Sequence, residues 1–229
     1  MVNVLVVGSG GREHALSWKL SQSELVDEVY VAPGNGGTSQ NIPISVDDID
    51  TLANFAQEKS CFTVVGPEAP LANGLVDKFI EKGLAVFGPS KQAAQLESSK
   101  IWAKEFMKRN DIPTADFEIF DDAQKAKEFV STYEKQVVIK ADGLAAGKGV
   151  IVCTNNDEAN DAIDKILVKK EFGDAGSKII IEERLDGIEA SYIALCDGQV
   201  GIPMATSQDH KRVYDDDKGP NTGGMGAYS

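Results

Sequence analysis

Hydrophobic residues in the first hundred positions form short continuous runs that alternate with helically spaced segments. The runs at 2–7 and 62–65 have the length of buried strands, whereas Leu16 and Leu20 repeat with the four-residue spacing of a helix. The whole pattern predicts strands at 2–7, 28–32, 62–65 and 85–87, and helices at 12–22, 49–58 and 71–81. This alternation predicts a parallel sheet with helices on both faces, as in a Rossmann-type doubly wound α/β domain.

Beyond residue 100 the pattern becomes richer in strands. A serine at 98 or 99 can cap a helix that ends near Arg109. The pattern then predicts strands at 117–120, 137–140, 150–153, 178–183 and 189–195, helices at 121–131 and 157–168, and a loop at 215–226. These elements predict a β-rich α+β module that begins near Lys100.

Composition narrows the class of protein. The net charge of −13 argues against nucleic acid as a partner, because phosphate backbones require a basic surface. No apolar run is long enough to cross a bilayer, and the first strand begins at Val2, which leaves no room for a signal sequence. Three cysteines, Cys61, Cys153 and Cys196, are odd in number and lack metal-ligand spacing. We expect them to be buried, reduced thiols of a cytosolic protein.

A glycine-rich turn, Gly8-Ser9-Gly10-Gly11-Arg12, joins the first strand to the first helix. Backbone N–H groups at such a helix start can hold an anion. A dinucleotide site would also need glycine at position 13, which is Glu13, and an acidic residue after the second strand, where the sequence reads Ala32-Pro33-Gly34-Asn35. The sequence therefore argues against NAD, and leaves open phosphate binding by this turn or a purely structural turn.

Two further loops leave the carboxyl edge of the same predicted sheet. They are Pro33-Gly34-Asn35 and Gly66-Pro67-Glu68-Ala69-Pro70. Each loop alone needs glycine and proline for its turn. Because ligands of open α/β sheets bind at this edge, three loops together favour a small-substrate site.

The strongest local motif is a glycine-rich loop after the strand at 137–140. It is not a Walker A loop, because Asp142 stands where the first glycine is required and Gly149 replaces the Ser/Thr that should follow Gly147-Lys148. A buried strand that ends in Lys140, followed by glycines and a second lysine, suits a mobile loop that folds over polyphosphate. A solvated hairpin is the alternative interpretation.

Charged residues follow another predicted strand, in Ile181-Glu182-Glu183-Arg184-Leu185. Carboxylates and backbone groups here could hydrogen-bond an adenine amine and a ribose hydroxyl, although a charged strand end is often only solvated. Two later loops, at 209–212 and 219–226, combine glycine with charged or polar side chains, and we expect them to face a ligand.

Taken in this order, the motifs resemble the glycinamide ribonucleotide synthetases (phosphoribosylamine–glycine ligases), a family of the ATP-grasp superfamily. The resemblance covers essentially the whole chain and is carried by residues 10–15, 32–35, 65–71, 140–150, 207–212 and 219–228. It implies a cytoplasmic ligase of purine biosynthesis. In that reaction ATP converts the glycine carboxylate to an acyl phosphate, and the amine of 5-phosphoribosylamine displaces phosphate to give glycinamide ribonucleotide.

The resemblance also implies roles for individual residues. The implied ATP-binding residues are Lys100, Lys140, Gly143, Gly147, Lys148, Gly149, Glu182, Glu183, Leu185 and Glu189. The implied phosphoribosylamine site consists of Gly10, Gly11, Arg12, Asn35 and Glu68. Asp209 and Lys211 are the implied catalytic residues, and they frame the reacting centre with the substrate loop Asn221-Thr222-Gly223-Gly224.

The resemblance implies that the chain consists of three parts. Residues 1–100 are expected to form a Rossmann-like substrate-binding domain, 101–190 the ATP-grasp linker and small lid subdomain, and 191–229 the start of a truncated large ATP-grasp subdomain. The family's ligands for Mg²⁺ (or Mn²⁺) would lie beyond Ser229, so we expect no metal ligand in this chain. We expect a fragment, or a naturally truncated form, with weak or no activity alone.

Two alternatives differ in class. Another ATP-grasp ligase of purine synthesis, or a biotin-carboxylase-like protein, would share both modules, but we do not expect it to carry the loops at 209–212 and 221–226. A non-catalytic nucleotide-binding module would bind ATP without glycine-dependent turnover. Oligomeric state, metal preference and membership of a multifunctional enzyme stay open.

Overall fold

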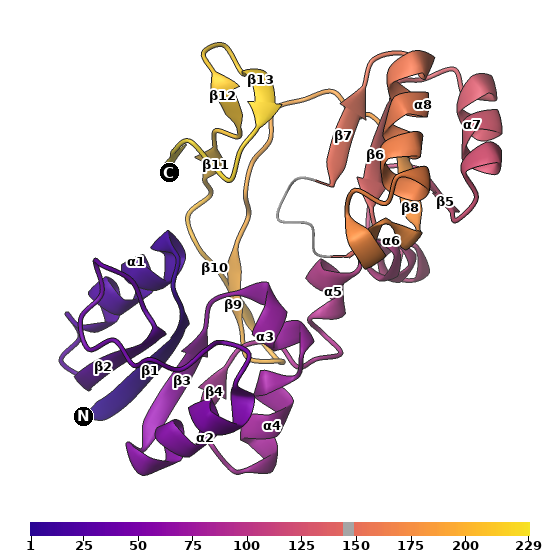
Figure 1. Cartoon of the computed structure of the whole chain (residues 1–229). Helices are drawn as coiled ribbons and strands as arrows, with labels where there is room; N and C mark the ends of the chain where they lie inside the picture. The colour runs from indigo at the N-terminus through magenta and orange to yellow at the C-terminus, as the bar shows by residue number, and fades with distance from the viewer. Residues whose placement is uncertain (144–148) are drawn as a thin grey trace. The chain divides into compact units, whose positions relative to one another are not determined.

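The computed structural model describes residues 1–143 and 149–229, and the chain forms two compact units, Met1–Ser99 and Lys100–Ser229 (Figure 1). Each unit has its own hydrophobic core. No helix of the described residues is both long enough and apolar enough to cross a membrane.

The first unit is a parallel sheet with helices on both sides. Its elements are β1 (Val2–Gly8), α1 (Gly11–Leu20), β2 (Val26–Pro33), α2 (Ile49–Glu58), β3 (Cys61–Val65), α3 (Glu68–Ala72), α4 (Leu75–Glu81), β4 (Val86–Phe87) and α5 (Gln95–Ser98). The strand order is β2-β1-β3-β4, and all three neighbouring pairs are parallel. The predicted doubly wound domain is therefore confirmed.

Alternate residues of β1 supply the two cores of this unit. Val4 and Val6 belong to a cluster against which Leu16 and Leu20 of α1 pack. Leu5 and Val7 belong to the other cluster, which α2 and α4 complete with side chains such as Phe79. Because neighbouring residues of a strand point to opposite faces, the continuous apolar run of β1 is what permits helices on both sides.

One predicted helix of this unit is wrong in its extent. The pattern indicated a single helix at 71–81, but the structure has α3 and α4 with a break between them. Gly74 lies at the break with φ of +90°, a left-handed conformation that glycine adopts without strain and that ends a regular helix. The short helix α5 was not predicted.

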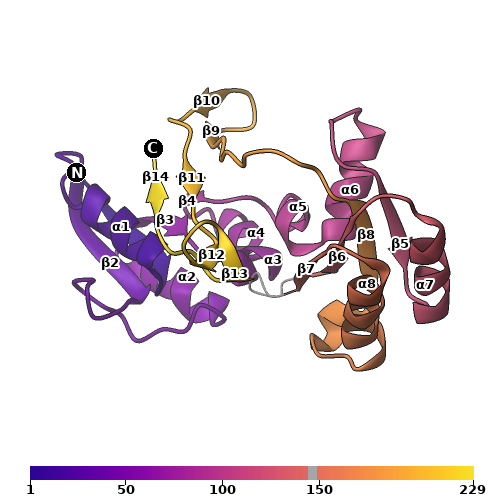
Figure 2. The same cartoon turned by 90° about the horizontal axis from the view of Figure 1, so that it is seen from above.

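The second unit contains an antiparallel sheet, one face of which is covered by two helices, α7 (Ala123–Thr132) and α8 (Asn156–Ile163) (Figure 2). Its elements up to residue 183 are α6 (Lys100–Arg109), β5 (Phe117–Phe120), α7, β6 (Val137–Ala141), β7 (Val150–Cys153), α8, a π-helical turn (Asp164–Val168), a 3₁₀ helix (Gly173–Ser177) and β8 (Ile179–Glu183). The strand order is β5-β8-β6-β7. Ile139 and Ile181 of this sheet pack with Ala126 and Val130 of α7 and with Ala159 and Ile163 of α8.

Short hairpins follow β8. They are formed by β9 (Ala194–Cys196) with β10 (Gly201–Pro203), β11 (Gln208–Asp209) with β14 (Ala227–Tyr228), and β12 (Arg212–Tyr214) with β13 (Lys218–Asn221). The prediction of one strand at 189–195 is wrong, because only Ala194–Cys196 pairs as a strand. The predicted loop at 215–226 instead contains β13. Asp216 and Asp217, with φ of +59° and +53°, make the tight turn that this hairpin needs.

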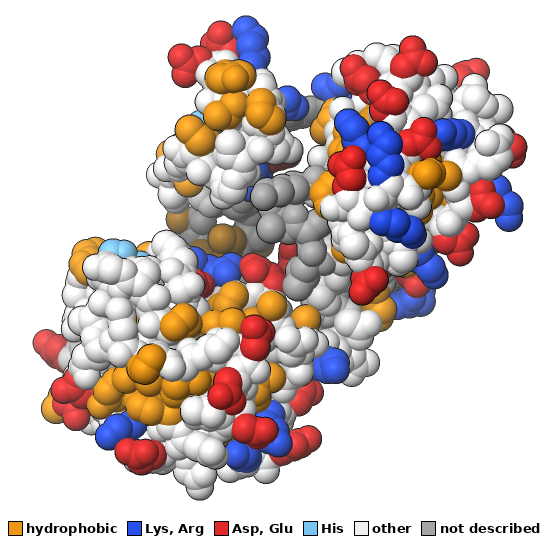
Figure 3. Space-filling view, in the orientation of Figure 1, with side chains coloured by type: hydrophobic (Ala, Val, Ile, Leu, Met, Phe, Trp, Pro, Cys, Tyr) orange, Lys and Arg blue, Asp and Glu red, His pale blue; other side chains and the backbone are white. Residues whose placement is uncertain are grey.

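Large hydrophobic side chains are exposed on these hairpins, as Figure 3 shows for the part that carries β12 and β13. Tyr214 is 66% exposed and Leu195 is 49% exposed. Cys196 is exposed as well, so the expectation of three buried thiols is correct only for Cys61 and Cys153. All three thiols are free.

Candidate functional site

The carboxyl ends of three strands meet at one edge of the first sheet. β1 lies between β2 and β3, and the loops that follow them are joined by backbone hydrogen bonds. The N–H of Gly34 donates to Gly8 O at 3.1 Å, and the N–H of Gly66 donates to Val7 O at 3.0 Å. The three loops that the sequence singled out are therefore adjacent.

Arg12 and Glu68 connect two of these loops. Arg12 Nη1 donates to Glu68 Oε1 at 2.9 Å, and both side chains are about half exposed. Desolvation lowers the pKa of Arg12, but hydrogen bonds to Glu68 and Glu13 outweigh it and raise the pKa above its ordinary value. The hydrogen bond from Arg12 holds the pKa of Glu68 below its usual range. The pair is thus an ion pair at neutral pH.

Asn35 connects the third loop to the glycine-rich turn. Its Nδ2 donates to the carbonyl oxygens of Ser9, at 2.9 Å, and Gly10, at 3.3 Å. Gly11 is the first residue of α1, and a β-carbon on it would meet nothing within 4 Å. The structure therefore gathers the predicted phosphoribosylamine residues at the start of one helix, where N–H groups can face an anion.

Glu13 is a residue of this site whose role the motif reading missed. It is 3% exposed, its Oε2 accepts the Gly10 N–H at 2.7 Å, and its Oε1 accepts from Arg12 Nε at 2.8 Å. The first contact is the half of a capping box that a glycine N-cap can make. The sequence signal for this role was an acidic residue three positions after Gly10, which is the spacing of a capping box.

A charged cluster lies on the second sheet. The register pairs Lys140 with Ile180 and Val138 with Glu182, so Lys140 and Glu182 lie on the same face as diagonal neighbours. Lys140 Nζ is 2.9 Å from Glu182 Oε2. Lys104 Nζ, which comes from α6 and was not predicted, is 3.2 Å from the same oxygen. A lysine four residues after Lys100 on the same helix was its only sequence signal.

The start of α6 contacts the beginning of the glycine-rich loop. Lys100 Nζ donates to Gly143 O at 2.9 Å, and the N–H of Ile101 donates to Asp142 Oδ1 at 3.1 Å. At the other end of the loop, Gly149 O accepts the N–H of Ala141 at 2.8 Å. The predicted residues Gly147 and Lys148 lie outside the described residues.

Glu183 differs from Glu182 in where its carboxylate lies. Successive side chains of β8 point to opposite faces, so Glu183 shares the face of Ile181, and its Oε1 is 2.5 Å from Lys135 Nζ. The structure therefore does not bring the Glu183 carboxylate to Lys140. Leu185 and Glu189 follow β8 and are exposed.

The predicted catalytic residues lie on the C-terminal hairpins. Asp209 and Lys211 form an ion pair, whose hydrogen bond lowers the pKa of Asp209. Thr222 N and Oγ1 both donate to Lys211 O, at 2.7 and 2.9 Å, and the N–H of Gly224 donates to Thr222 Oγ1 at 3.0 Å. Asn221 pairs with Arg212, and Gly223 follows Thr222 in this loop. The hairpins thus hold Asp209, Lys211 and the predicted substrate loop together.

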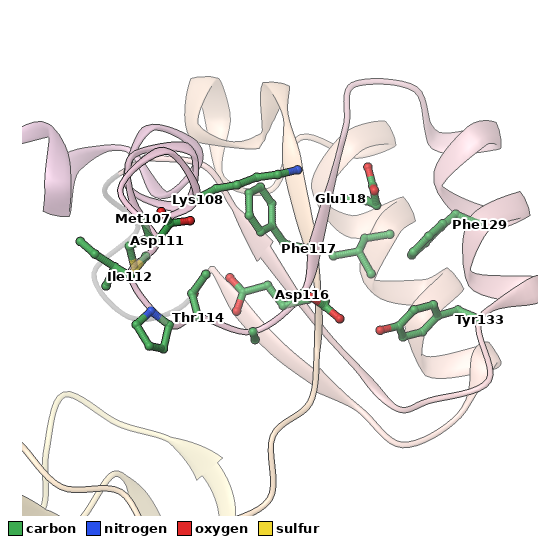
Figure 4. A pocket seen from close by; sticks show the side chains of 14 residues that line it. Met107, Lys108, Asp111, Ile112, Thr114, Asp116, Phe117, Glu118, Phe129 and Tyr133 are labelled. Atoms are coloured by element: carbon green, nitrogen blue, oxygen red, sulfur yellow. The ribbon is translucent and has the colours of Figure 1, made fainter.

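A pocket with a volume of about 590 Å³ opens beside the turn between α6 and β5 (Figure 4). Met107, Thr114 and Phe117 line it, and Phe129 of α7 and Tyr133, which follows α7, line its other end. Of the predicted nucleotide residues that the structure describes, only Glu182 lines this pocket. Among the described residues no three His, Cys, Asp or Glu side chains gather as a possible metal site.

Comparisons with known proteins identify the family. The family model "Phosphoribosylglycinamide synthetase, N domain" matches residues 2–97, and "Phosphoribosylglycinamide synthetase, ATP-grasp (A) domain" matches residues 98–229. The chain is 58% identical to a phosphoribosylamine–glycine ligase of Ralstonia nicotianae, over 100% of this chain and 55% of the relative. It is 56% identical to the Escherichia coli ligase, over 100% of this chain and 54% of the relative. The chain therefore spans about half the length of the curated relatives that it matches.

Solved structures agree with these matches. A phosphoribosylamine–glycine ligase of Thermotoga maritima superposes with a TM-score of 0.83 at 35% identity, over 99% of this chain and 55% of that chain. The biotin carboxylase domain of a Hydrogenobacter thermophilus 2-oxoglutarate carboxylase has a TM-score of 0.66 at 19% identity, over 92% of this chain and 50% of that chain. The second likeness shows the fold alone.

Proposed function

The chain belongs to the phosphoribosylglycinamide synthetase family, and we propose that it supplies the phosphoribosylamine-binding domain and part of the ATP-binding domain of a phosphoribosylamine–glycine ligase. The cluster of Arg12, Asn35 and Glu68 at the glycine-rich turn carries this proposal. This cluster gives an anionic substrate both a helix start and a guanidinium group, and the Glu68 carboxylate can face an amine or hydroxyl groups.

The proposed nucleotide site lies in the second unit. Lys140 would hold phosphate groups of ATP, together with Lys100, whose ammonium group donates to Gly143 O, and with the glycine-rich loop that the sequence predicts to fold over them. Glu182, the backbone of Glu183 and Leu185, and Glu189 would hold the adenosine. Lys140 suits this role because it lies near the end of the buried strand β6 yet keeps 26% of its side chain exposed.

The proposed reaction has two steps. The glycine carboxylate attacks the γ-phosphorus of ATP, which releases ADP and forms glycyl phosphate. The amine of 5-phosphoribosylamine then attacks the carbonyl carbon and expels phosphate, and glycinamide ribonucleotide results. Asp209, Lys211 and the loop Asn221-Thr222-Gly223-Gly224 would orient the reacting groups, because positioning and charge neutralisation supply most of the catalysis in such transfers.

A divalent cation completes the proposal. Mg²⁺ or Mn²⁺ would neutralise the phosphates of ATP, with oxygen ligands from polypeptide beyond the residues of this chain. We place the enzyme in the cytoplasm, where purine synthesis would supply its substrates.

The experiment measures ADP release with Mg²⁺ while glycine or phosphoribosylamine is left out in turn. It uses the 229-residue chain and the same chain fused to the remaining C-terminal part of the Escherichia coli relative. We expect the fusion to release ADP only when both substrates are present, and the shorter chain to be weak or silent. ATP binding without glycine-dependent turnover in the fusion would instead identify a non-catalytic nucleotide-binding module.

A further inference from the structure

Lys104 is a buried ammonium group that no motif singled out. Its side chain is 8% exposed, and its Nζ lies 2.7 Å from Thr114 Oγ1, 3.1 Å from Ala115 O and 3.2 Å from Glu182 Oε2. An ammonium group has three protons to donate. Two hydrogen bonds and one ion pair therefore partner this ammonium group, which is the condition under which a protein can bury a charge.

The carboxylate that Lys104 contacts also serves Lys140. Glu182 is 7% exposed at its side chain, and its Oε2 lies 2.9 Å from Lys140 Nζ. Two positive charges thus share one negative charge, which leaves the cluster with a net charge of +1. Thr114 and Ala115 anchor Lys104, whereas Lys140 is the member that solvent reaches.

We propose that Lys104 is a positioning residue: it holds the Glu182 carboxylate from inside the unit and so leaves the Lys140 ammonium available to a ligand with several phosphates. The identity of that ligand rests on the proposed function, whereas the charge sharing does not. Without Lys104, Lys140 is the one positive partner that the described residues give the Glu182 carboxylate, and the cluster of these two residues is neutral. The attraction for polyphosphate then falls, because it depends on uncompensated positive charge close to the phosphates.

Lys108 provides a matched control on the same helix. It lies one turn after Lys104, and both ammonium groups lie over the ring of Phe117. The distance to the ring centroid is 5.8 Å for Lys108 Nζ and 5.4 Å for Lys104 Nζ. Among the described residues, Glu182 forms ion pairs with Lys104 and Lys140 but not with Lys108. Removing either lysine changes the net charge of the chain equally, but of these two lysines only Lys104 shares the Glu182 carboxylate with Lys140.

The first test needs no nucleotide. The 229-residue chain, Lys104→Gln and Lys108→Gln are treated with a trace of acetylating reagent, and the rate at Lys140 is followed by mass spectrometry. We expect acetylation of Lys140 to slow about threefold or more in Lys104→Gln, because an unshared carboxylate stabilises its unreactive ammonium form. Lys108→Gln should stay near the wild-type rate. A structural role alone would loosen the sheet and speed the reaction, so an equal or faster rate overturns the proposal.

A second variant guards against a folding failure. Lys104→Met combined with Thr114→Val replaces the buried ammonium group and one of its acceptors with apolar groups of similar size. This double change should lower the folding stability less than removal of the ammonium group alone, because the Thr114 hydroxyl is not left without its donor. Thr114 is exposed, so the second change is mild. The same slower acetylation of Lys140 is expected, and an unchanged rate would refute the proposal in the same way.

The second test separates this inference from the proposed function. Affinities for AMP, ADP and ATP are measured by calorimetry for the same three chains. We expect Lys104→Gln to lose about tenfold for ATP, about 1.4 kcal/mol, and less than about threefold for AMP. A uniform loss for all three nucleotides would overturn the positioning role. If the wild-type chain binds none of them, the nucleotide site of the proposed function fails, while acetylation of Lys140 still decides the role of Lys104.

Discussion

The carboxylate of Glu13 occupies the space in which a side chain on Gly66 would lie. A β-carbon built on Gly66 would be 2.0 Å from Glu13 Oε1, and one built on Gly8 would be 2.5 Å from Glu13 Cγ. Because Glu13 also accepts hydrogen bonds from Gly10 and Arg12, one buried side chain packs between the glycine-rich turn and the loop after β3. The glycines of this site are required for the close approach of Glu13.

We expect Gly66→Ala to destabilise the first unit by about 1–3 kcal/mol, the usual cost of forcing extra volume into a packed site. Urea unfolding measures the change. Gly36→Ala is the control, because a β-carbon on Gly36 meets nothing within 4 Å. Equal stability of the two variants would show that Glu13 can move aside.

The Arg12–Glu68 pair predicts a pH dependence. The hydrogen bond from Arg12 lowers the pKa of Glu68 in the folded state, and desolvation opposes it. A carboxylate with a lowered folded-state pKa stabilises the fold above its unfolded value, about 4.3, and this contribution is lost as pH falls through the folded value. In a carbon-13 NMR titration, Glu68 should titrate below the ordinary range, and Arg12→Gln should move the midpoint upward. The same midpoint in both proteins would mean that the pair does not form in solution.

Lys140→Ala is expected to weaken ATP binding while the fold stays intact. Removal of a charge-assisted hydrogen bond to phosphate should cost on the order of tenfold or more in affinity. The fold should survive because Lys104 still partners the Glu182 carboxylate. Calorimetry with ATP and a thermal melt check both points, with exposed Lys169→Ala as the control. Unchanged ATP affinity would remove Lys140 from the proposed site.

The three cysteines should differ in reactivity. Burial raises the pKa of Cys61 and of Cys153 to about 11, so their reactive thiolates are rare at pH 8. Cys196 is exposed. Iodoacetamide at pH 8 should therefore label one thiol quickly and two slowly, as mass spectrometry of the intact chain can show. Cys196→Ser should remove the fast phase, and rapid labelling of Cys61 would contradict the packing around β3.

The local pattern of hydrophobic and polar residues was sufficient to predict most of the strands and helices. The strand Phe117–Phe120, the strand Val150–Cys153 and the helix Ile49–Glu58 lie where the hydrophobic spacing predicted them. Their signals are local, because a continuous apolar run or a helical repeat is a property of neighbouring residues. The hairpin β12–β13 was not predicted, because its strands are short, lack a continuous apolar run and are defined by their pairing across Asp216 and Asp217.

The sequence by itself determined the fold class, the family and the loops at the sheet edge, because glycine-rich turns after apolar strands keep their order along the chain. Only the tertiary structure decided which side chains meet. The register of β6 and β8 brought Lys140 to Glu182 and turned Glu183 toward Lys135. Packing of α6 brought Lys104 to the same carboxylate. These contacts join residues about 40 to 80 positions apart, and no local pattern of hydrophobic and polar residues encodes such a distance.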